Sequence, residues 1–339
     1  MKPACARLRN REGTHAMLNR RHLLAAASLP LLPVAARAQG EFPNKPLRLI
    51  LAFAPGGGTD LIARTLAGAM QGPLGQPVIV DNRPGAGGNL STELAAAAPA
   101  DGHTLLMGNH GPMSVNPTLF RNMRVDPAVA LEPIGLVADA PLVVVVGKRS
   151  KANTLAELLA EIRAAKGDVT YGSASNGSAS HLAAALLLQM TGLEAVHVPY
   201  RGAAPALTDV VGGTTHFMVT TLPSVVGLIN GNSVRPLAVT GEARMSVLPA
   251  VPTVAEAGVP GYKATAWYGI LVPKGTPAPV KAKLFAAMRT ALSDPQVAHR
   301  LRDEGAEPST MDGPGFAALM REERTRWAEV VRKANITVD

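Results

Sequence analysis

The chain of 339 residues contains little cysteine, few aromatic residues and few charged residues. Its single cysteine is Cys5, so the rest of the sequence offers no disulfide, no thiolate nucleophile and no cysteine ligand for a metal. Aromatic residues make up 4% of the sequence, and aliphatic side chains must therefore fill the core. Apolar residues at 47% and charged residues at 17% exclude a disordered tail and indicate a folded chain. Its length allows one large domain or two ordinary ones.

The net positive charge outside the N-terminal segment is small. The formal net charge is +8, but residues 1–38 hold seven of the basic residues and one of the acidic residues. The remainder carries 26 basic and 24 acidic side chains, which is nearly neutral. A nearly neutral body lacks the basic surface that binds a phosphate polymer, so we expect no nucleic-acid partner.

The N-terminal segment has the pattern of an export signal. Arg20–Arg21 precede an apolar run over 23–36, and Ala36 and Ala38 provide small residues for cleavage. The run is about 14 residues long, whereas a membrane-spanning helix needs roughly 20. We therefore predict a signal peptide at 1–38, cleaved near Ala38, and a free periplasmic product. A twin-arginine and a general secretory route both remain open, as do Met1 and Met17 as the start.

Apolar runs alternate with helical patterns along the rest of the chain. The predicted strands are 47–53, 78–81, 104–107, 142–146, 169–171, 196–198, 217–219, 237–240 and 266–272. The predicted helices include 61–70, 154–167 with a capping box at its start, 178–190, 280–292, 296–304 and 315–333. The alternation predicts a parallel α/β sheet, and the last third predicts a helical cover.

Two glycine-rich turns follow strands in the first part of the chain. The first consists of Pro55, Gly56, Gly57, Gly58, Thr59 and Asp60. Backbone amides of such a turn can approach a carboxylate or phosphate at a helix start, and Asp60 would cap the helix or orient the turn. The second, 81–89, fits neither a dinucleotide fingerprint, because Leu90 replaces the last glycine, nor a phosphate loop. A structural turn and a ligand role both stay open for it.

Two further turns follow strands in the middle of the chain. The first contains Ser173, Ser175, Asn176, Gly177, Ser178 and His181, whose polar groups can cap a helix or donate to an oxyanion. A hydrolase based on Ser178 and His181 is disfavoured because the G-x-S-x-G spacing is absent. The second contains Tyr200, Arg201 and Gly202, where Tyr200 can contact a ligand and Arg201 can pair with a carboxylate or stay solvated.

The mature histidines show neither the H-x-x-x-H nor the H-E-x-x-H pattern, and we expect no metal and no cofactor. His110 follows a predicted strand in a glycine-flanked loop, and both a cleft and a surface position are open for it. His197 lies in an apolar strand and is expected to be an interior residue.

Several ordered segments together resemble one receptor family. They are 53–60, 80–89, 100–106, 200–202, 249–258 and 267–269, which read FAPGGGTD, VDNRPGAGGN, ADGHTLL, YRG, PAVPTVAEAG and WYG. On these segments the chain resembles the Bug-type extracytoplasmic solute receptors, the substrate-binding components of tripartite tricarboxylate transporters. The resemblance covers essentially the whole mature chain.

The resemblance implies a fold and a site. The fold is α/β with the two lobes of a type II periplasmic binding protein, which close on a ligand like a flytrap, and with C-terminal helices. One discontinuous lobe would span 39–138 and 266–339, and the other 139–265. A carboxylate would lie between Pro55–Asp60 of one lobe and Ser173–Ser178 with His181 of the other, and Tyr200 and Gly202 would line the second wall.

The resemblance also implies a function without catalysis. The protein would capture a small carboxylic acid and deliver it to a two-subunit membrane transporter component. We separately expect a monomer. One departure from the family pattern is His216, with Thr220 and Thr221, where family members often carry an acidic or amide side chain. This departure favours a plain carboxylic acid over an amino acid. Alternatives are a receptor that feeds a membrane signalling system and, less favoured, an exported hydrolase.

Overall fold

The computed structural model describes residues 41–333 and 336–338. The signal peptide predicted for 1–38 lies outside the described residues. By its internal contacts the chain divides into one unit of residues 1–41 and another of residues 42–339, and the fold is that of the second unit. Among the described helices, none is both long enough and apolar enough to cross a bilayer.

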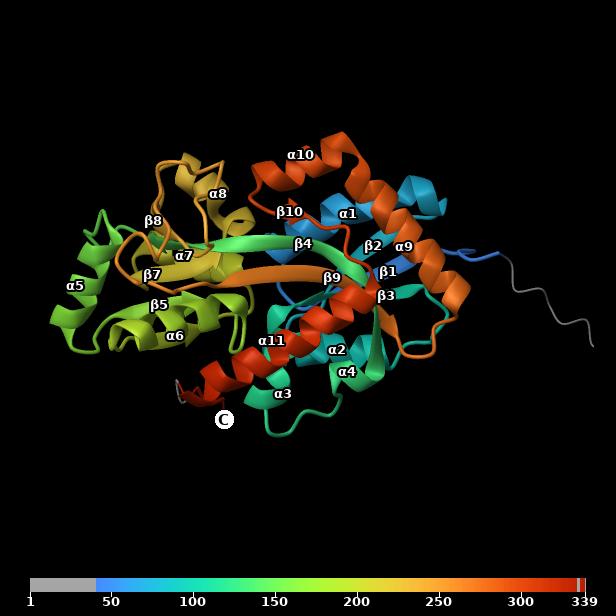
Figure 1. The fold of residues 1–339 in the computed structure, drawn as a ribbon, viewed down its shortest axis with the longest axis horizontal. Helices are drawn as coiled ribbons and strands as arrows, with labels where there is room; N and C mark the ends of the chain where they lie inside the picture. The colour runs from blue at the N-terminus through green and yellow to red at the C-terminus, as the bar shows by residue number, and fades with distance from the viewer. Residues whose placement is uncertain (1–40, 334–335, 339) are drawn as a thin grey trace, which may run out of the picture. The chain divides into compact units, whose positions relative to one another are not determined.

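A mixed sheet of ten strands organises the described part of the chain (Figure 1). The strand order is β2-β1-β3-β9-β4-β7-β5-β6, and β8 and β10 pair with β4 outside this path. The strands are β1 (Leu47–Leu51), β2 (Val78–Asn82), β3 (Thr104–Asn109), β4 (Leu131–Val146), β5 (Thr170–Ser173), β6 (Val196–Pro199), β7 (Phe217–Thr221), β8 (Arg235–Val239), β9 (Thr265–Pro273) and β10 (Glu307–Pro308).

The prediction of a parallel sheet is only partly right. β2, β1 and β3 are parallel to one another, and so are β7, β5 and β6. Between these groups, β3 and β9, β9 and β4, and β4 and β7 pair in antiparallel fashion. The reason is that β9 and β4 are long strands that cross the middle of the sheet rather than members of β-α-β units (Figure 1).

β4 connects the two halves of the sheet. It pairs with β9 through Pro141 and with β7 and β8 from Leu142 or Val143 onward. The apolar run 142–146 predicts only the second part of this strand, because Glu132, Pro133 and Asp139 interrupt the hydrophobic pattern of the first part.

Helices connect the strands and cover the sheet. They are α1 (Gly58–Leu74), η1 (Ala86–Gly88), α2 (Asn89–Ala96), η2 (Gly111–Val115), α3 (Asn116–Leu119), α4 (Pro127–Ala130), α5 (Leu155–Ala165), α6 (Ala179–Thr191), α7 (Ala203–Gly212), α8 (Leu222–Asn230), α9 (Ala278–Ser293), α10 (Pro295–Asp303) and α11 (Gly313–Lys333). The predicted start of α5 is confirmed, since Thr154 Oγ1 accepts from the Glu157 amide at 3.2 Å.

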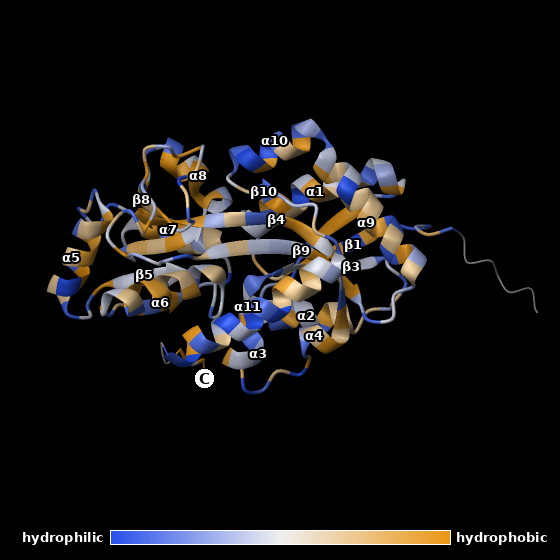
Figure 2. Ribbon diagram, in the orientation of Figure 1, coloured by the Kyte–Doolittle hydropathy of each residue, from blue (hydrophilic) through white to orange (hydrophobic). Residues whose placement is uncertain are grey.

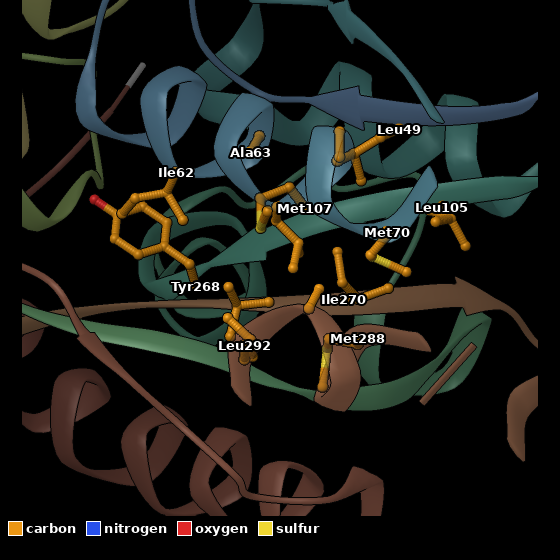
Figure 3. Packing of buried hydrophobic residues seen from close by; sticks show 14 of the residues in the cluster. Leu49, Ile62, Ala63, Met70, Leu105, Met107, Tyr268, Ile270, Met288 and Leu292 are labelled. Atoms are coloured by element: carbon orange, nitrogen blue, oxygen red, sulfur yellow. The ribbon is translucent and has the colours of Figure 1, made fainter. Parts of the chain in front are cut away.

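The core lies on both faces of the sheet in separate clusters. In the half that contains β1, Leu49, Met107 and Ile270 pack with Ile62 of α1 and Met288 of α9 (Figure 3). In the half that contains β7, a cluster on one face is built around α5 and α6 and a cluster on the other around α7 and α8. Apolar residues concentrate on the strands and on α7 and α8, whereas α10 and much of α11 are hydrophilic (Figure 2).

The three C-terminal helices return to the half of the sheet that contains β1, as the predicted helical cover requires. α9 contributes Leu284 and Met288 to the core around β1. α11 contributes Phe316, which packs edge to face against Trp267 of β9 with ring centroids 5.2 Å apart.

Candidate functional site

A cavity lies where strands of both halves of the sheet end. The ends of β1, β3, β5 and β7 supply part of its wall, and β9 supplies Ala266 and Tyr268. Its volume is about 50 Å³, which is room for a few water-sized groups and excludes a polymer. The lining residues are Phe53, Gly57, Gly58, Thr59, Asn109, His110, Ala174, Ser178, Ala179, Ser180, Ala203, Thr220, Thr221, Ser224, Ala266 and Tyr268.

Four helices begin at this cavity. The N-terminal caps of α1, α6 and α8 are Gly57, Ser178 and Thr221, and all three line the cavity. α7 begins at Ala203, which also lines it. The first amides of a helix have no acceptor within the helix, and the helix dipole places partial positive charge there. The cavity is therefore surrounded by hydrogen-bond donors and positive potential.

The first glycine-rich turn is held in shape by Asp60. The Asp60 carboxylate accepts hydrogen bonds from the Gly56 amide at 3.0 Å, from Asn82 Nδ2 at 3.0 Å and from Arg64 Nε at 3.0 Å. Burial alone would raise the pKa of Asp60, but these hydrogen bonds hold it below its usual value. Asp60 is 4% exposed and does not line the cavity, so it orients the turn rather than repelling an anion in it.

The glycine-rich turn touches the other half of the sheet directly. The Gly58 amide donates to Ser224 Oγ of α8 at 2.7 Å, and the Ala54 amide donates to the Arg201 carbonyl at 3.0 Å. A Cβ atom at Gly58 would lie 2.7 Å from Thr221 Oγ1 and 2.9 Å from Ser224 Oγ. Only glycine allows this approach.

The serine-rich turn before α6 is an internal hydrogen-bond network. Ser178 Oγ accepts from the His181 amide at 3.3 Å, as an N-terminal cap does, and donates to the Ser175 carbonyl at 2.7 Å. Ser180 Oγ accepts from the Ala174 amide at 2.8 Å. The hydroxyls therefore fix the helix start, and because the His181 amide is paired, the amides of Ala179 and Ser180 are the ones left for another acceptor.

The cavity contains little side-chain charge. No Asp, Glu, Lys or Arg side chain is among its lining residues in the described part of the chain. The titratable groups are His110, which is 1% exposed, and Tyr268, which is 3% exposed. Burial raises the pKa of Tyr268, and its contacts with the hydroxyls of Thr221 and Thr59 only partly offset the shift. In Figure 3 its hydroxyl points away from the other labelled core residues.

The structure places four of the predicted site residues in the cavity wall, namely Gly57, Gly58, Thr59 and Ser178. Ser175 and Tyr200 instead line a neighbouring depression with Gly85–Gly88 and Arg201. The remaining predicted residues line neither, and they are Pro55, Gly56, Asp60, Ser173, Asn176, Gly177, His181 and Gly202.

Local contacts explain why several of these residues lie outside the cavity. His181 Nδ1 accepts from the Gly177 amide at 3.1 Å, and its ring stacks on His197 with centroids 3.8 Å apart. Tyr200 donates to Asp209, and burial together with this carboxylate raises the pKa of Tyr200 to about 12. Gly202 packs against Ala54, and a Cβ atom added to Gly202 would lie 3.1 Å from the backbone nitrogen of Ala54.

The hydroxyl and imidazole groups do not form an accessible nucleophile–base pair at Ser178. Ser173 Oγ does lie 2.6 Å from His197 Nε2, but Ser173 is fully buried and outside the cavity. A nucleophile must reach its substrate, so this pair serves the packing of β5 against β6. Within residues 41–333 and 336–338 no group of three metal-ligating side chains is found.

The sequence alone did not single out several lining residues. Asn109, Ser180, Ser224 and Tyr268 come from β3, α6, α8 and β9, and tertiary packing brings them together. Asn109 and His110 closely follow the predicted strand 104–107. Because ligands of α/β sheets bind at the C-terminal ends of the strands, this position indicates a place near the ligand. His216 precedes β7, whereas Thr220 and Thr221 end it, so only the threonines reach the cavity.

Comparisons with known proteins agree with this geometry. Residues 62–336 match the family described as tripartite tricarboxylate transporter family receptor. A structure titled "R. palustris Rpa4515 with adipate" is 34% identical, with a TM-score of 0.86, and the match covers 88% of this chain and 99% of that one.

Two further solved structures are similar. One is periplasmic binding protein BugD, at 34% identity and a TM-score of 0.84, covering 87% of this chain and 99% of that one. The other is MatC from Rhodopseudomonas palustris with bound malate, at 33% identity and a TM-score of 0.82, covering 86% and 100%. The chain has the periplasmic-binding-protein fold, and it belongs to the TctC or Bug family of solute receptors, which are binding proteins rather than enzymes.

Proposed function

We propose that this receptor captures a small carboxylic acid in the cavity, for delivery to the membrane component of a tripartite tricarboxylate-type transporter. The observation that carries the proposal is the convergence of four helix starts on one cavity, which no acidic side chain of the described residues lines. Backbone amides aimed at one point stabilise an anion without a cationic side chain. The relatives whose titles name adipate and malate support the same ligand class.

We also propose which residues hold the carboxylate. Gly58 already donates to Ser224, so the next amide of α1, that of Thr59, is the donor from the first helix. The amides of Ala179 and Ser180 at the start of α6 are the donors from the other half. Ser178 and Asp60 act through the backbone, because they fix the two helix starts.

Ligand capture would proceed by closure of two lobes. The proposed lobes are 39–138 with 266–339, and 139–265, and the change of partners in β4 near Pro141 supports a crossing there. The hydrogen bonds from Gly58 to Ser224 and from Ala54 to Arg201 join the proposed lobes. A ligand that binds the closed form better shifts the population toward it, and the membrane component can recognise the closed pair.

The lining favours a plain carboxylic acid over an amino acid. An ammonium group in a cavity needs an acceptor with negative charge, and the lining formed by residues 41–333 and 336–338 offers hydroxyl and amide groups but no carboxylate. Thr220 and Thr221 stand where an acidic or amide side chain is frequent in the family, which supports this preference. His216 carries no weight here, because its Nδ1 accepts from the Thr170 amide at 3.0 Å, away from the cavity.

Thermal shift and calorimetry test the proposal on the purified mature protein. A ligand at about 100 times its Kd adds roughly 2.7 kcal/mol to the free energy of unfolding, so a panel of organic acids will show binders as a raised Tm. We expect a carboxylic acid to bind and the corresponding amino acid to bind at least tenfold more weakly. Tight binding of the amino acid without its deaminated analogue contradicts the proposal.

Transport and signalling by the same closure differ in the membrane partner. We propose transport, and expect genes for two membrane subunits beside the gene for this chain. Export to the periplasm would depend on the predicted signal, so replacement of Arg20–Arg21 by lysines distinguishes the routes: it blocks twin-arginine export and leaves general secretion intact. We expect a monomer in sedimentation experiments.

A further inference from the structure

A depression of about 220 Å³ lies beside the cavity, between the same two halves of the sheet. Phe53 lines both hollows, so they adjoin at this residue. The second glycine-rich turn forms one wall through Gly85–Gly88, and Ser175, Tyr200 and Arg201 from the other half of the sheet form another. Arg201 is exposed, so the depression opens to the surface. It is therefore placed as a route from solvent to the cavity.

Arg201 is the one charged residue in the lining of the depression, as far as residues 41–333 and 336–338 are concerned. Its carbonyl accepts from the Ala54 amide at 3.0 Å, which fixes its backbone where the two halves meet. Its guanidinium has neither a hydrogen bond nor an ion pair with the described residues. Asp209, which accepts from the Tyr200 hydroxyl, is not part of the lining. A full, uncompensated positive charge therefore stands in the depression.

The arginines on the other side of the depression are compensated by carboxylates. Arg64 Nη2 lies 3.0 Å from Asp60 Oδ1. Arg83 Nε lies 2.9 Å from Asp81 Oδ1, and Arg48 pairs with the same carboxylate. None of these arginines lines the depression or the cavity. They add a weaker positive background, and the free guanidinium in the depression dominates the local charge.

The cavity and the depression attract an anion over different distances. The partial charges of a helix start act within about one turn of the helix. A full charge acts over the Debye length, about 10 Å at 0.1 M salt. No Asp, Glu, Lys or Arg side chain of the described residues lines the cavity, so its attraction is of the short-range kind. An anion that approaches through the depression is therefore attracted first by Arg201 and only then by the amides.

We infer that the depression is the entrance of the cavity, and that Arg201 is a positioning residue that captures the anionic ligand there. The ligand then passes Phe53 and reaches the helix starts, where Arg201 no longer contacts its carboxylate. Arg201 thus acts on the association rate constant kon, and the amides hold the bound ligand. The hydrogen bond from Ala54 to Arg201 joins the proposed lobes, so closure narrows the entrance after capture. The inference rests on the proposed function, because it assumes an anion in the cavity.

Rate measurements at two salt concentrations test the role of Arg201. The probes are adipate and malate, or the acid of the panel with the largest Tm shift if neither binds. Stopped-flow tryptophan fluorescence gives kon and koff, and line-shape NMR of the acid replaces it if the fluorescence does not change. At about 0.02 M salt, Arg201→Gln should lower kon by about threefold to tenfold without raising koff. At about 0.5 M salt the difference should shrink to less than about twofold.

Two matched variants control for charge and position. Arg201→Lys keeps the positive charge and should keep kon within about twofold of the wild type. Arg163→Gln removes an exposed arginine in the last turn of α5, in the same half of the sheet and with the same change in net charge. It should leave kon and koff unchanged, because α5 does not line the depression or the cavity.

A bulky side chain in the depression tests the entrance separately. Ala86 is exposed and lines the depression. Ala86→Phe should lower kon and koff by similar factors at both salt concentrations and change the Kd little, because it obstructs the route without touching the bound ligand. Ala164→Phe, on the exposed surface of α5, should change neither rate constant. Unchanged rate constants in Ala86→Phe would mean that the ligand enters elsewhere.

The outcomes separate this inference from the proposed function. A wild-type protein that binds no acid of the panel refutes both. If the wild type binds an acid but Arg201→Gln has the same kon as the wild type at low salt, or no larger an effect than Arg163→Gln, the capture role alone is wrong. A raised koff with an unchanged kon in Arg201→Gln would also contradict it, because Arg201 would then be a direct contact of the bound carboxylate.

Discussion

Two groups of buried polar side chains lie near α6, and they differ in how their hydrogen bonds are met. At the cavity, Asn109 and His110 keep polar atoms without partners. Between α6 and β6, the stacked rings of His181 and His197 have partners within the protein. His181 is paired with the Gly177 amide, and His197 is paired with the Ser173 hydroxyl. The difference teaches that burial of a histidine does not by itself mark a ligand site. Polar atoms without partners beside a cavity are the stronger indication of a ligand contact.

The stacked pair should control acid stability and not ligand binding. Burial lowers the pKa of His181 to about 3, with the charge of His197 adding to the shift, and lowers the pKa of His197 to about 4. Both values lie below the ordinary 6.5, so the unfolded chain takes up protons that the folded chain refuses. Stability is therefore full above about pH 6.5 and falls as the pH drops toward 4.

His197→Gln tests this assignment. For one histidine the loss amounts to at most about 3 kcal/mol between pH 6.5 and 4. We expect the variant to show a smaller decrease in unfolding free energy over this range than the wild type, each relative to its own value at pH 7.5, in urea titrations. The Kd for a carboxylic acid at pH 7.5 should stay unchanged. A large change in Kd, with an unaltered dependence of the unfolding free energy on pH, would contradict this assignment. It would mean that the stacked histidine pair serves ligand binding and not acid stability.

Gly58→Val should hinder closure of the two halves on the ligand while the protein still folds. The added side chain would meet Thr221 Oγ1 and Ser224 Oγ, which belong to the opposite half of the sheet. Overpacking of this kind costs about 1–3 kcal/mol, which corresponds to a loss of ligand affinity of roughly fivefold to somewhat more than a hundredfold. Calorimetry measures the loss, and small-angle scattering with ligand should show incomplete closure.

The matched control lies in the same helix. A Cβ at Gly68 of α1 meets no atom within 4 Å, so Gly68→Ala should leave the Kd unchanged and raise stability by up to about 1 kcal/mol. Equal effects of the two substitutions on binding would mean that the close approach at Gly58 is unrelated to the ligand.

The extent to which the sequence predicts this molecule follows from the range of the contacts involved. The strands around Leu49 and Leu105 and the helix containing Ile62 were predictable, because their patterns are local. The first glycine-rich turn was predictable for the same reason, and four predicted residues of the site lie in the cavity wall.

Long-range pairing set the limit of that prediction. The first part of β4 contains Glu132, Pro133 and Asp139 and becomes a strand because β9 pairs with it. Likewise Ser224 and Tyr268 reach the cavity only through the packing of α8 and β9 against other elements. No local pattern marks such residues. His110 was recognised from its place after a strand, with a cleft and a surface position both open, and Asn109 could have been found in the same way.

Ser224→Ala should give the smallest effect of these substitutions. It removes the acceptor of the Gly58 amide, a hydrogen bond between the two halves that is 2.7 Å long. A neutral hydrogen bond contributes about 1 kcal/mol, so we expect roughly fivefold weaker binding and a similar small loss of stability with ligand bound. Thr208→Ala, at an exposed hydroxyl that bonds only within α7, is the control and should change neither. A Ser224→Ala protein that binds as tightly as the wild type would show that this hydrogen bond does not stabilise the ligand-bound form.

The most direct test of the account is a crystal structure of the mature protein with the tightest-binding acid of the panel. We predict one carboxylate in the cavity, with oxygens about 3 Å from the amide nitrogens of Thr59 and of Ala179 or Ser180. A carboxylate bound outside this cavity, or one held there without any amide from a helix start, would contradict the account.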